Sequence, residues 1–226
     1  MLLHGGTGCH GDWVYAGREQ LILDYRLIAP DARGHGKSTN PQKTITHRQC
    51  ALDTLALLDH LGIERCKAIG VSLGGNILLH MATLQPERIE AMVVVSATTH
   101  FPEQARAIMA AVPSPDDQST SEWAAMRKRH HLGDEQIRAL WEWSHLLKDS
   151  FDDINFSSAD LSAIRARTLI VQGDRDPLYP VEMAVEIYRA IPKSALWFVP
   201  TGGHGPVFFE AAPQFAHTAL AFLRSE

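Results

Sequence analysis

Short apolar runs alternate along the chain with longer segments of helical periodicity. Runs at 66–69, 91–95, 168–171 and 196–199 predict strands, and the shorter runs 2–3 and 26–29 predict two more. Helical spacing of apolar residues predicts helices over 45–61, from the glycines at 74–75 to 84, over 181–190 and over 211–223. This alternation predicts an α/β fold in which helices cover both faces of a mostly parallel sheet.

The segment 99–164 departs from this rhythm. It shows no strand pattern, but it has helix-start signals at 119–121 and at Asp134. It also contains Trp123, Trp141 and Trp143, three of the five tryptophans. We interpret it as a helical cap inserted into a core formed by 1–98 and 165–226. A cap over a site needs an apolar underside, so these three tryptophans are candidate pocket residues.

Composition narrows the class of protein. The 226 residues are 45% hydrophobic, enough for one core with an insertion. Twenty-one Lys and Arg against 26 Asp and Glu give a net charge of −5. The sequence has no basic stripe, so we expect no nucleic-acid partner. No apolar run is long enough to span a bilayer, so we expect a protein without a membrane partner. Three widely spaced cysteines are typical of free thiols in a reducing compartment, which indicates the cytoplasm.

The candidate chemistry follows the predicted strands, where sites form in open parallel sheets. Ser72 lies in the G-x-S-x-G pattern of residues 70–74, between a strand and a helix. The flanking glycines leave room for a sharp turn that exposes the serine hydroxyl. A tight structural turn is the alternative interpretation of this serine.

A serine hydroxyl needs a base, and the base needs a carboxylate to orient it. His204 follows the last predicted strand in a glycine-rich loop, from which its imidazole could reach Ser72. Asp174 and Asp176 both follow the strand at 168–171. We favour Asp176, which directly precedes Pro177, and leave Asp174 as the alternative.

These motifs together resemble the α/β-hydrolase superfamily, and specifically its serine carboxylesterase-like members. The similar segments are H-G-G-T-G at 4–8, D-A-R-G-H-G-K-S at 31–38, G-V-S-L-G-G at 70–75, G-D-R-D-P at 173–177 and G-G-H-G at 202–205. They occur in the family's order across nearly the whole chain, and segment 99–164 corresponds to the family's variable cap.

The resemblance implies a catalytic triad of Ser72, Asp176 and His204. It also implies an oxyanion hole formed by the backbone N–H groups of Gly6 and Leu73, with Gly5 beside the substrate. Hydrolysis of small to medium carboxylic esters through an acyl-enzyme is the leading hypothesis, with a small-molecule ester as the partner and no cofactor.

Several alternatives remain open. The same residues could serve a lactone or carbon–carbon bond hydrolase, an acyltransferase or a perhydrolase, and a non-catalytic ligand-binding relative is a further alternative. Twelve histidines raise the question of a metal. No H-x-x-x-H motif or Cys/His cluster of ligand spacing appears, however, so none is expected.

The chain departs from the family at its start. Members carry further strands before the H-G-G loop, whereas here only residues 1–3 precede it. If the first strands are missing, the predicted strand at 26–29 would form an exposed sheet edge. Such an edge pairs readily with a second chain, and the corresponding hypothesis is a homodimer.

Overall fold

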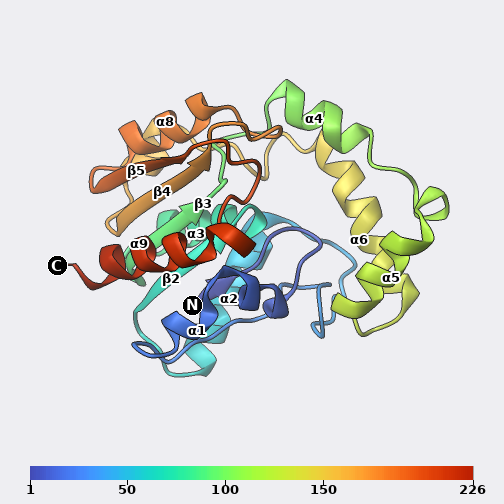
Figure 1. Cartoon of the computed structure of the whole chain (residues 1–226), viewed down its shortest axis with the longest axis horizontal. Coiled ribbons are helices and arrows are strands. Elements are labelled where there is room, and N and C mark those ends of the chain that lie inside the picture. Colours follow the sequence, from blue (N-terminus) through green and yellow to red (C-terminus); the bar gives the residue numbers. More distant parts are fainter. Residues whose placement is uncertain (226) are drawn as a thin grey trace.

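A five-stranded parallel sheet forms the centre of the protein (Figure 1). The computed structural model describes residues 1–225. The strands pair in sequence order: β1 (Leu2–Leu3), β2 (Cys66–Val71), β3 (Ile89–Val95), β4 (Arg167–Gly173) and β5 (Ser194–Val199). All four pairings are parallel, so the carboxyl ends of the strands meet at one edge of the sheet.

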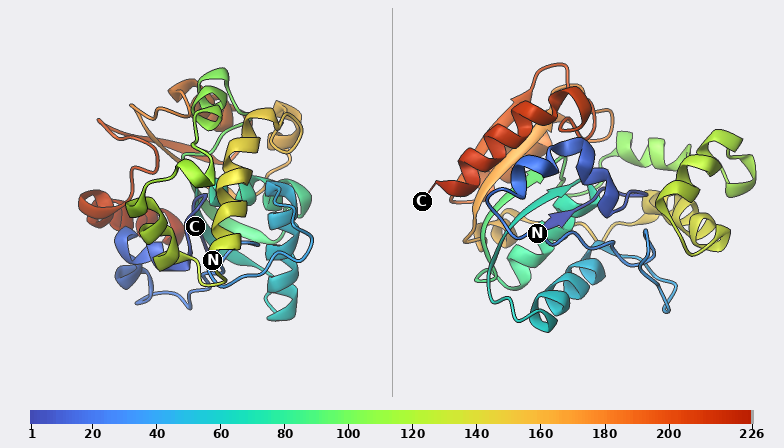
Figure 2. Two further views of the ribbon diagram at one scale, coloured as in Figure 1. Left: turned by 90° about the vertical axis from the view of Figure 1, so that its right-hand side faces the viewer. Right: turned by 60° about the horizontal axis from the view of Figure 1, so that its bottom comes forward.

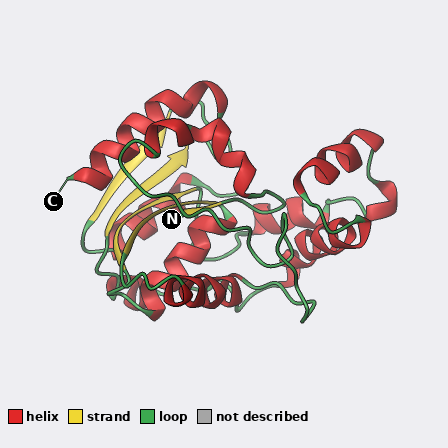
Figure 3. Cartoon of the chain, turned by 90° about the horizontal axis from the view of Figure 1, so that it is seen from below, coloured by secondary structure: helices red, strands yellow, loops and turns green. Residues whose placement is uncertain are grey.

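Helices cover both faces of this sheet (Figure 3). One face packs against α2 (His47–His60), α3 (Leu73–Leu84), α7 (Ser158–Ser162) and α8 (Val181–Ala190). The other packs against the 3₁₀ helix η1 (His10–Ala16), α1 (Arg18–Leu21) and α9 (Ala212–Arg224). Alternate side chains of β3 pack into the hydrophobic cores on the two faces of the sheet. Met92 and Val94 belong to the core on the first face, and Val93 and Val95 belong to the core on the second. A strand buried on both faces explains the nearly continuous apolar run at 91–95.

Segment 99–164 is helical, as its pattern predicts. It contains α4 (Glu103–Ala110), η2 (Pro115–Asp117), α5 (Thr120–Arg129), α6 (Asp134–Leu146), η3 (Leu147–Asp149) and α7. The side chain of Ser119 caps α5 and forms a capping box with Glu122, which explains the start signal in the sequence. Helices α4, α5 and α6 project to one side of the sheet (Figures 1 and 2). The remaining short helix, η4 (Phe209–Ala211), precedes α9.

The expected strand at 26–29 is wrong. This segment lies beside β1, and the Leu2 N–H donates a hydrogen bond to the Ile28 carbonyl at 2.8 Å, but it forms no strand. The reason is the length of its neighbour: β1 has only two residues, too few to support a ladder. In the part of the chain that is described, no helix is both long and apolar enough to cross a membrane.

Candidate active site

Ser72 lies at the turn between β2 and α3. Its backbone has φ +53° and ψ −111°, a conformation that L-residues rarely adopt. Neighbouring glycines make the turn possible. A Cβ on Gly70 would lie 2.2 Å from the carbonyl oxygen of Gly74, and one on Gly74 would lie 2.1 Å from that of Leu3. Packing of α3 against the sheet therefore holds Ser72 in this strained position.

The structure brings Ser72, His204 and Asp176 into one hydrogen-bonded line. His204 Nε2 lies 2.8 Å from Ser72 Oγ, and His204 Nδ1 lies 2.8 Å from Asp176 Oδ2. These contacts join loops that follow β2, β4 and β5. Since the Asp176 carboxylate accepts the Nδ1 proton, the unprotonated Nε2 faces the serine hydroxyl.

Backbone and side-chain donors hold the carboxylate of Asp176. Its Oδ1 accepts hydrogen bonds from the N–H groups of Leu178 at 2.8 Å and Tyr179 at 3.2 Å, and its Oδ2 accepts one from Gln172 Nε2 at 2.9 Å. Burial raises the pKa of Asp176. The hydrogen bond and charge of His204, with the two N–H groups, outweigh burial and keep that pKa below 3.8. The neighbouring Asp174 is exposed to solvent.

Two supporting residues were not predicted from the sequence. Gln172, at the end of β4, is fully buried and connects Asp176 to the Tyr179 carbonyl. Ser96, just after β3, is also fully buried, and its Oγ accepts a hydrogen bond from the Gly205 N–H at 3.0 Å. A polar residue at the carboxyl end of an apolar strand was the available signal for both.

Two backbone N–H groups near Ser72 remain free among residues 1–225. Those of Gly6 and Leu73 donate to no other group there, and Leu73 begins α3, where the first donors lack helical partners. His4 fixes the Gly6 loop: its Nδ1–H donates to the Gly5 carbonyl at 2.7 Å, while its Nε2 accepts from the Ala32 N–H at 3.0 Å. Both ring nitrogens of His4 therefore hydrogen-bond within the loops.

A pocket of about 230 Å³ opens on Ser72 and His204. Aromatic side chains supply much of its wall, and Gly5 and Gly6 of the H-G-G loop also line it. The other lining residues are His4, Gly8, Asp12, Trp13, Tyr15, Val71, Arg129, Gly205, Phe208 and Phe209. The aromatic pair at 208–209, just after the G-G-H-G motif, could have been recognised in the sequence as pocket wall.

The three tryptophans of segment 99–164 differ in their positions. A Cβ on Gly6 would lie 3.5 Å from the Trp143 ring, which places this side chain against the H-G-G loop. None of the three lines the pocket that opens on Ser72, contrary to expectation. Trp123 and Trp141 lie elsewhere in the segment. They pack edge to face at 4.6 Å in the small core between α5 and α6, because that hairpin must bury its own apolar surface.

The α5–α6 turn attaches segment 99–164 to the sheet loops. His130 is buried: its Nδ1 accepts a hydrogen bond from the Gly36 N–H at 2.9 Å, and its Nε2–H donates to the Thr7 carbonyl at 3.0 Å. Gln136 Nε2 donates to the carbonyls of Gly34 and Gly36. These contacts hold segment 99–164 against the loop that contains Gly6.

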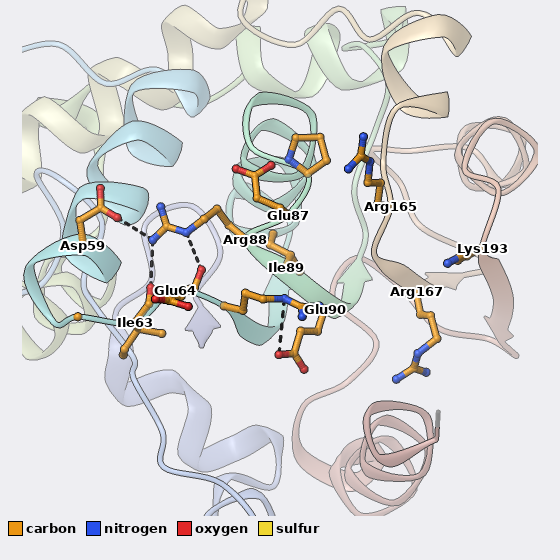
Figure 4. A pocket seen from close by; sticks show the side chains of 13 residues that line it. Asp59, Ile63, Glu64, Glu87, Arg88, Ile89, Glu90, Arg165, Arg167 and Lys193 are labelled. Atoms are coloured by element: carbon orange, nitrogen blue, oxygen red, sulfur yellow. Dashed lines mark hydrogen bonds and ion pairs between the residues drawn. The ribbon is translucent and has the colours of Figure 1, made fainter.

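A larger hollow, of about 970 Å³, lies among the amino ends of the strands and contains neither Ser72 nor His204 (Figure 4). Charged side chains line it, and several pair with one another. Arg88 lies 2.7 Å from Asp59, and Arg65 lies 3.8 Å from Glu90. This hollow therefore lies at the opposite edge of the sheet from Ser72 and His204.

The sequence model of the alpha/beta hydrolase family matches residues 1–218 of the chain. The chain is 28% identical over 249 residues to a putative carbamate hydrolase, RutD, of Pseudomonas syringae pv. syringae (strain B728a), covering 100% of this chain and 94% of that protein. It is 27% identical over 252 residues to a 2-hydroxymuconate semialdehyde hydrolase of Pseudomonas sp. (strain CF600), covering 99% and 86%.

Solved structures show the same fold. A hydrolase from Pseudomonas aeruginosa PA01 is 26% identical with a TM-score of 0.75, covering 99% of this chain and 89% of that one. A meta-cleavage product hydrolase from Pseudomonas fluorescens IP01 (CumD) is 21% identical with a TM-score of 0.79, covering 98% and 89%. At that identity the second likeness is one of fold alone.

Proposed function

The chain belongs to the α/β-hydrolase family, and we propose that it is a serine hydrolase that cleaves carboxylic esters of small to medium acyl groups. The observation that carries the proposal is the Asp176–His204–Ser72 line, which opens on a pocket with aromatic walls. The pocket volume of about 230 Å³ is smaller than the roughly 300–1,000 Å³ of pockets for drug-sized ligands, and this small volume favours a short acyl group.

Acylation begins with the Ser72 hydroxyl. His204 Nε2 takes the proton as Oγ attacks the ester carbonyl, and Asp176 stabilises the imidazolium that forms. The N–H groups of Leu73 and Gly6 then donate to the oxyanion, an interaction that grows with charge in the transition state. His204 returns the proton to the departing alkoxide, leaving an acyl group on Ser72.

Deacylation repeats these steps with water. His204 takes a proton from water, the resulting hydroxide attacks the acyl carbonyl, and the proton returns to Ser72 Oγ as the acid leaves. The strained Ser72 backbone supports this role, because such strain is found where a side chain must be held in a reactive position.

The test is hydrolysis of p-nitrophenyl esters from acetate to decanoate. We expect the highest kcat/KM among acetate, propionate and butyrate, since longer chains exceed the pocket. In Ser72→Ala the nucleophile is gone, and kcat should fall by at least about 10³-fold. Circular dichroism controls for folding. A folded Ser72→Ala protein that retains turnover would refute the assignment of Ser72.

A second candidate is cleavage of carbamates or of carbon–carbon bonds next to a carbonyl. The observation that favours it is the full-length similarity to a putative carbamate hydrolase and a 2-hydroxymuconate semialdehyde hydrolase. The same Ser72 and His204 could act on these substrates. Adding an N-alkyl carbamate and a dienoate ring-cleavage product to the ester panel distinguishes the candidates, because the preferred class should have the highest kcat/KM.

A further inference from the structure

A thiol, an imidazole and a carboxylate meet beside the H-G-G loop, outside the pocket. Cys9 directly precedes η1, His10 is its first residue, and Asp31 lies in the D-A-R-G-H-G loop. One donor atom from each side chain lies within 4.8 Å of the donor atoms of the other two. Tetrahedral Zn²⁺ uses bonds of about 2.0–2.3 Å to nitrogen, oxygen and sulfur, so its ligand atoms lie roughly 3.3–3.8 Å apart. The distance of 2.9 Å between His10 Nδ1 and Asp31 Oδ1 is already close to this spacing.

The carboxylate of this cluster is held rigidly. Asp31 Oδ1 accepts hydrogen bonds from the His10 N–H at 2.7 Å and from His10 Nδ1 at 2.9 Å, and Oδ2 accepts one from the Lys37 N–H at 2.9 Å. Only 5% of the Asp31 side chain is exposed.

The thiol and imidazole complete a donor set that suits a thiophilic cation. Cys9 is buried and in no disulfide. Burial raises the pKa of its thiol, so a cation must displace the thiol proton when it binds. The His10 side chain is 44% exposed, which leaves a side open to water. Mg²⁺ and Ca²⁺ prefer oxygen ligands, whereas mixed S, N and O donors suit Zn²⁺.

We propose that Cys9, His10 and Asp31 form a Zn²⁺ site that ties the H-G-G loop to the D-A-R-G-H-G loop. On binding, the cation replaces the Cys9 thiol proton and the proton between His10 Nδ1 and Asp31. The thiol proton goes to solvent, and the Nδ1 proton moves through solvent to Nε2, so the imidazole stays neutral as Nδ1 binds the cation. Cys9 is three residues from Gly6, so the ion would fix the position of the Gly6 N–H. This site does not depend on which bond the enzyme cleaves, and it departs from the sequence-based expectation of no metal.

The test uses the full chain, treated with EDTA and then titrated with Co²⁺ and Zn²⁺. We expect one equivalent of Co²⁺ to bind with a thiolate-to-metal charge-transfer band, which one equivalent of Zn²⁺ abolishes. Cys9→Ser should remove the band, and His10→Gln should weaken Zn²⁺ binding at least about tenfold. Cys66→Ser is the matched control, because Cys66 is a free cysteine in β2 and its loss should change neither value.

Thiol alkylation followed by mass spectrometry gives a second measurement on the unmodified sequence. Zn²⁺ should slow alkylation of Cys9 while leaving the rates at Cys50 and Cys66 unchanged. The proposal is overturned if no stoichiometric Co²⁺ or Zn²⁺ binds. Unchanged binding in both Cys9→Ser and His10→Gln would overturn it as well, as would equal protection of all three thiols.

Discussion

Individual histidines differ according to what surrounds their rings. His204 has a carboxylate on one nitrogen and a hydroxyl on the other, an arrangement suited to moving a proton. His80, in α3, instead donates from Nε2 to the Asp153 carbonyl at 2.7 Å, and its ring packs on Phe156. Burial lowers the pKa of His80 from 6.5 to about 4, despite that hydrogen bond. His80 is therefore neutral in the folded protein at neutral pH.

His80 should make the protein less stable in mild acid. Between pH 6.5 and 4 the unfolded chain binds a proton at this histidine that the folded chain does not. Its contribution to the free energy of unfolding is therefore fully present above pH 6.5. This contribution decreases as the pH is lowered, by about 2 kcal/mol at pH 5. Urea unfolding measures the decrease in the free energy of unfolding between pH 8 and pH 5. This decrease should be about 2 kcal/mol smaller in His80→Gln than in the unmodified protein.

The control for this prediction is His217→Gln, because His217 lies on the exposed side of α9. It should retain the pH dependence of the unmodified protein. The same pH dependence in His80→Gln would show that His80 does not titrate as described. His4, His35 and His130, whose pKa values burial also lowers, contribute equally to all three proteins and cancel in the comparison.

Sequence reasoning located single residues best where they follow a strand. Ser72, Asp176 and His204 could be placed together because parallel strands bring their carboxyl ends to one edge. The proximity of Asp31 to Cys9 and His10, and of His130 to Gly36, could not be inferred. These contacts join loops 21 and 94 residues apart, and no periodic pattern specifies how loops fold over one another.

At the scale of elements, the contact between α3 and β1 determines the position of Ser72. Gly74 lies in the first turn of α3, directly against the Leu3 carbonyl of β1. Strand β1 has only two residues, so it has little pairing of its own to resist displacement. The close approach of helix and strand therefore depends on the absence of a side chain at residue 74.

Gly74→Ala should push α3 away from β1. The new Cβ would lie 2.1 Å from the Leu3 carbonyl oxygen, and overpacking of this kind costs about 1–3 kcal/mol. We expect a loss of that size in urea unfolding, together with reduced ester hydrolysis. Gly203→Ala is the stability control, since nothing lies within 4 Å of a Cβ there. Equal stability of the two variants would contradict this account of the turn.

Elements with strong periodicity were predicted closely, whereas the short segment 26–29 was not. The expected helix at 181–190 coincides with α8, and the strand at 91–95 lies within β3. The segment 26–29 has the composition of a strand but pairs through a single hydrogen bond, because its neighbour β1 is too short. Composition indicates how readily a segment extends, whereas a strand also requires a partner of sufficient length.

At the scale of the whole molecule, the pocket lies where segment 99–164 meets the sheet loops. Arg129 of α5 and Asp12 of η1 both line it, and their side chains pair across this junction at 3.1 Å. Together with His130 and Gln136, this pair holds segment 99–164 beside the Ser72 pocket. The shape of that junction sets the size of the pocket, which is why substrate class could not be predicted from the motifs.

Labelling with a fluorophosphonate tests the central claim most directly, because it reports the reactivity of Ser72 whatever the natural substrate. Intact-mass spectrometry should show one adduct per chain, with peptide mapping placing it on Ser72. His204→Ala should label at least about 100-fold more slowly, because the base is lost, and Ser72→Ala should not label. A folded, unmodified protein that stays unlabelled, or an adduct that persists in Ser72→Ala, would contradict the assignment of Ser72 as an activated nucleophile.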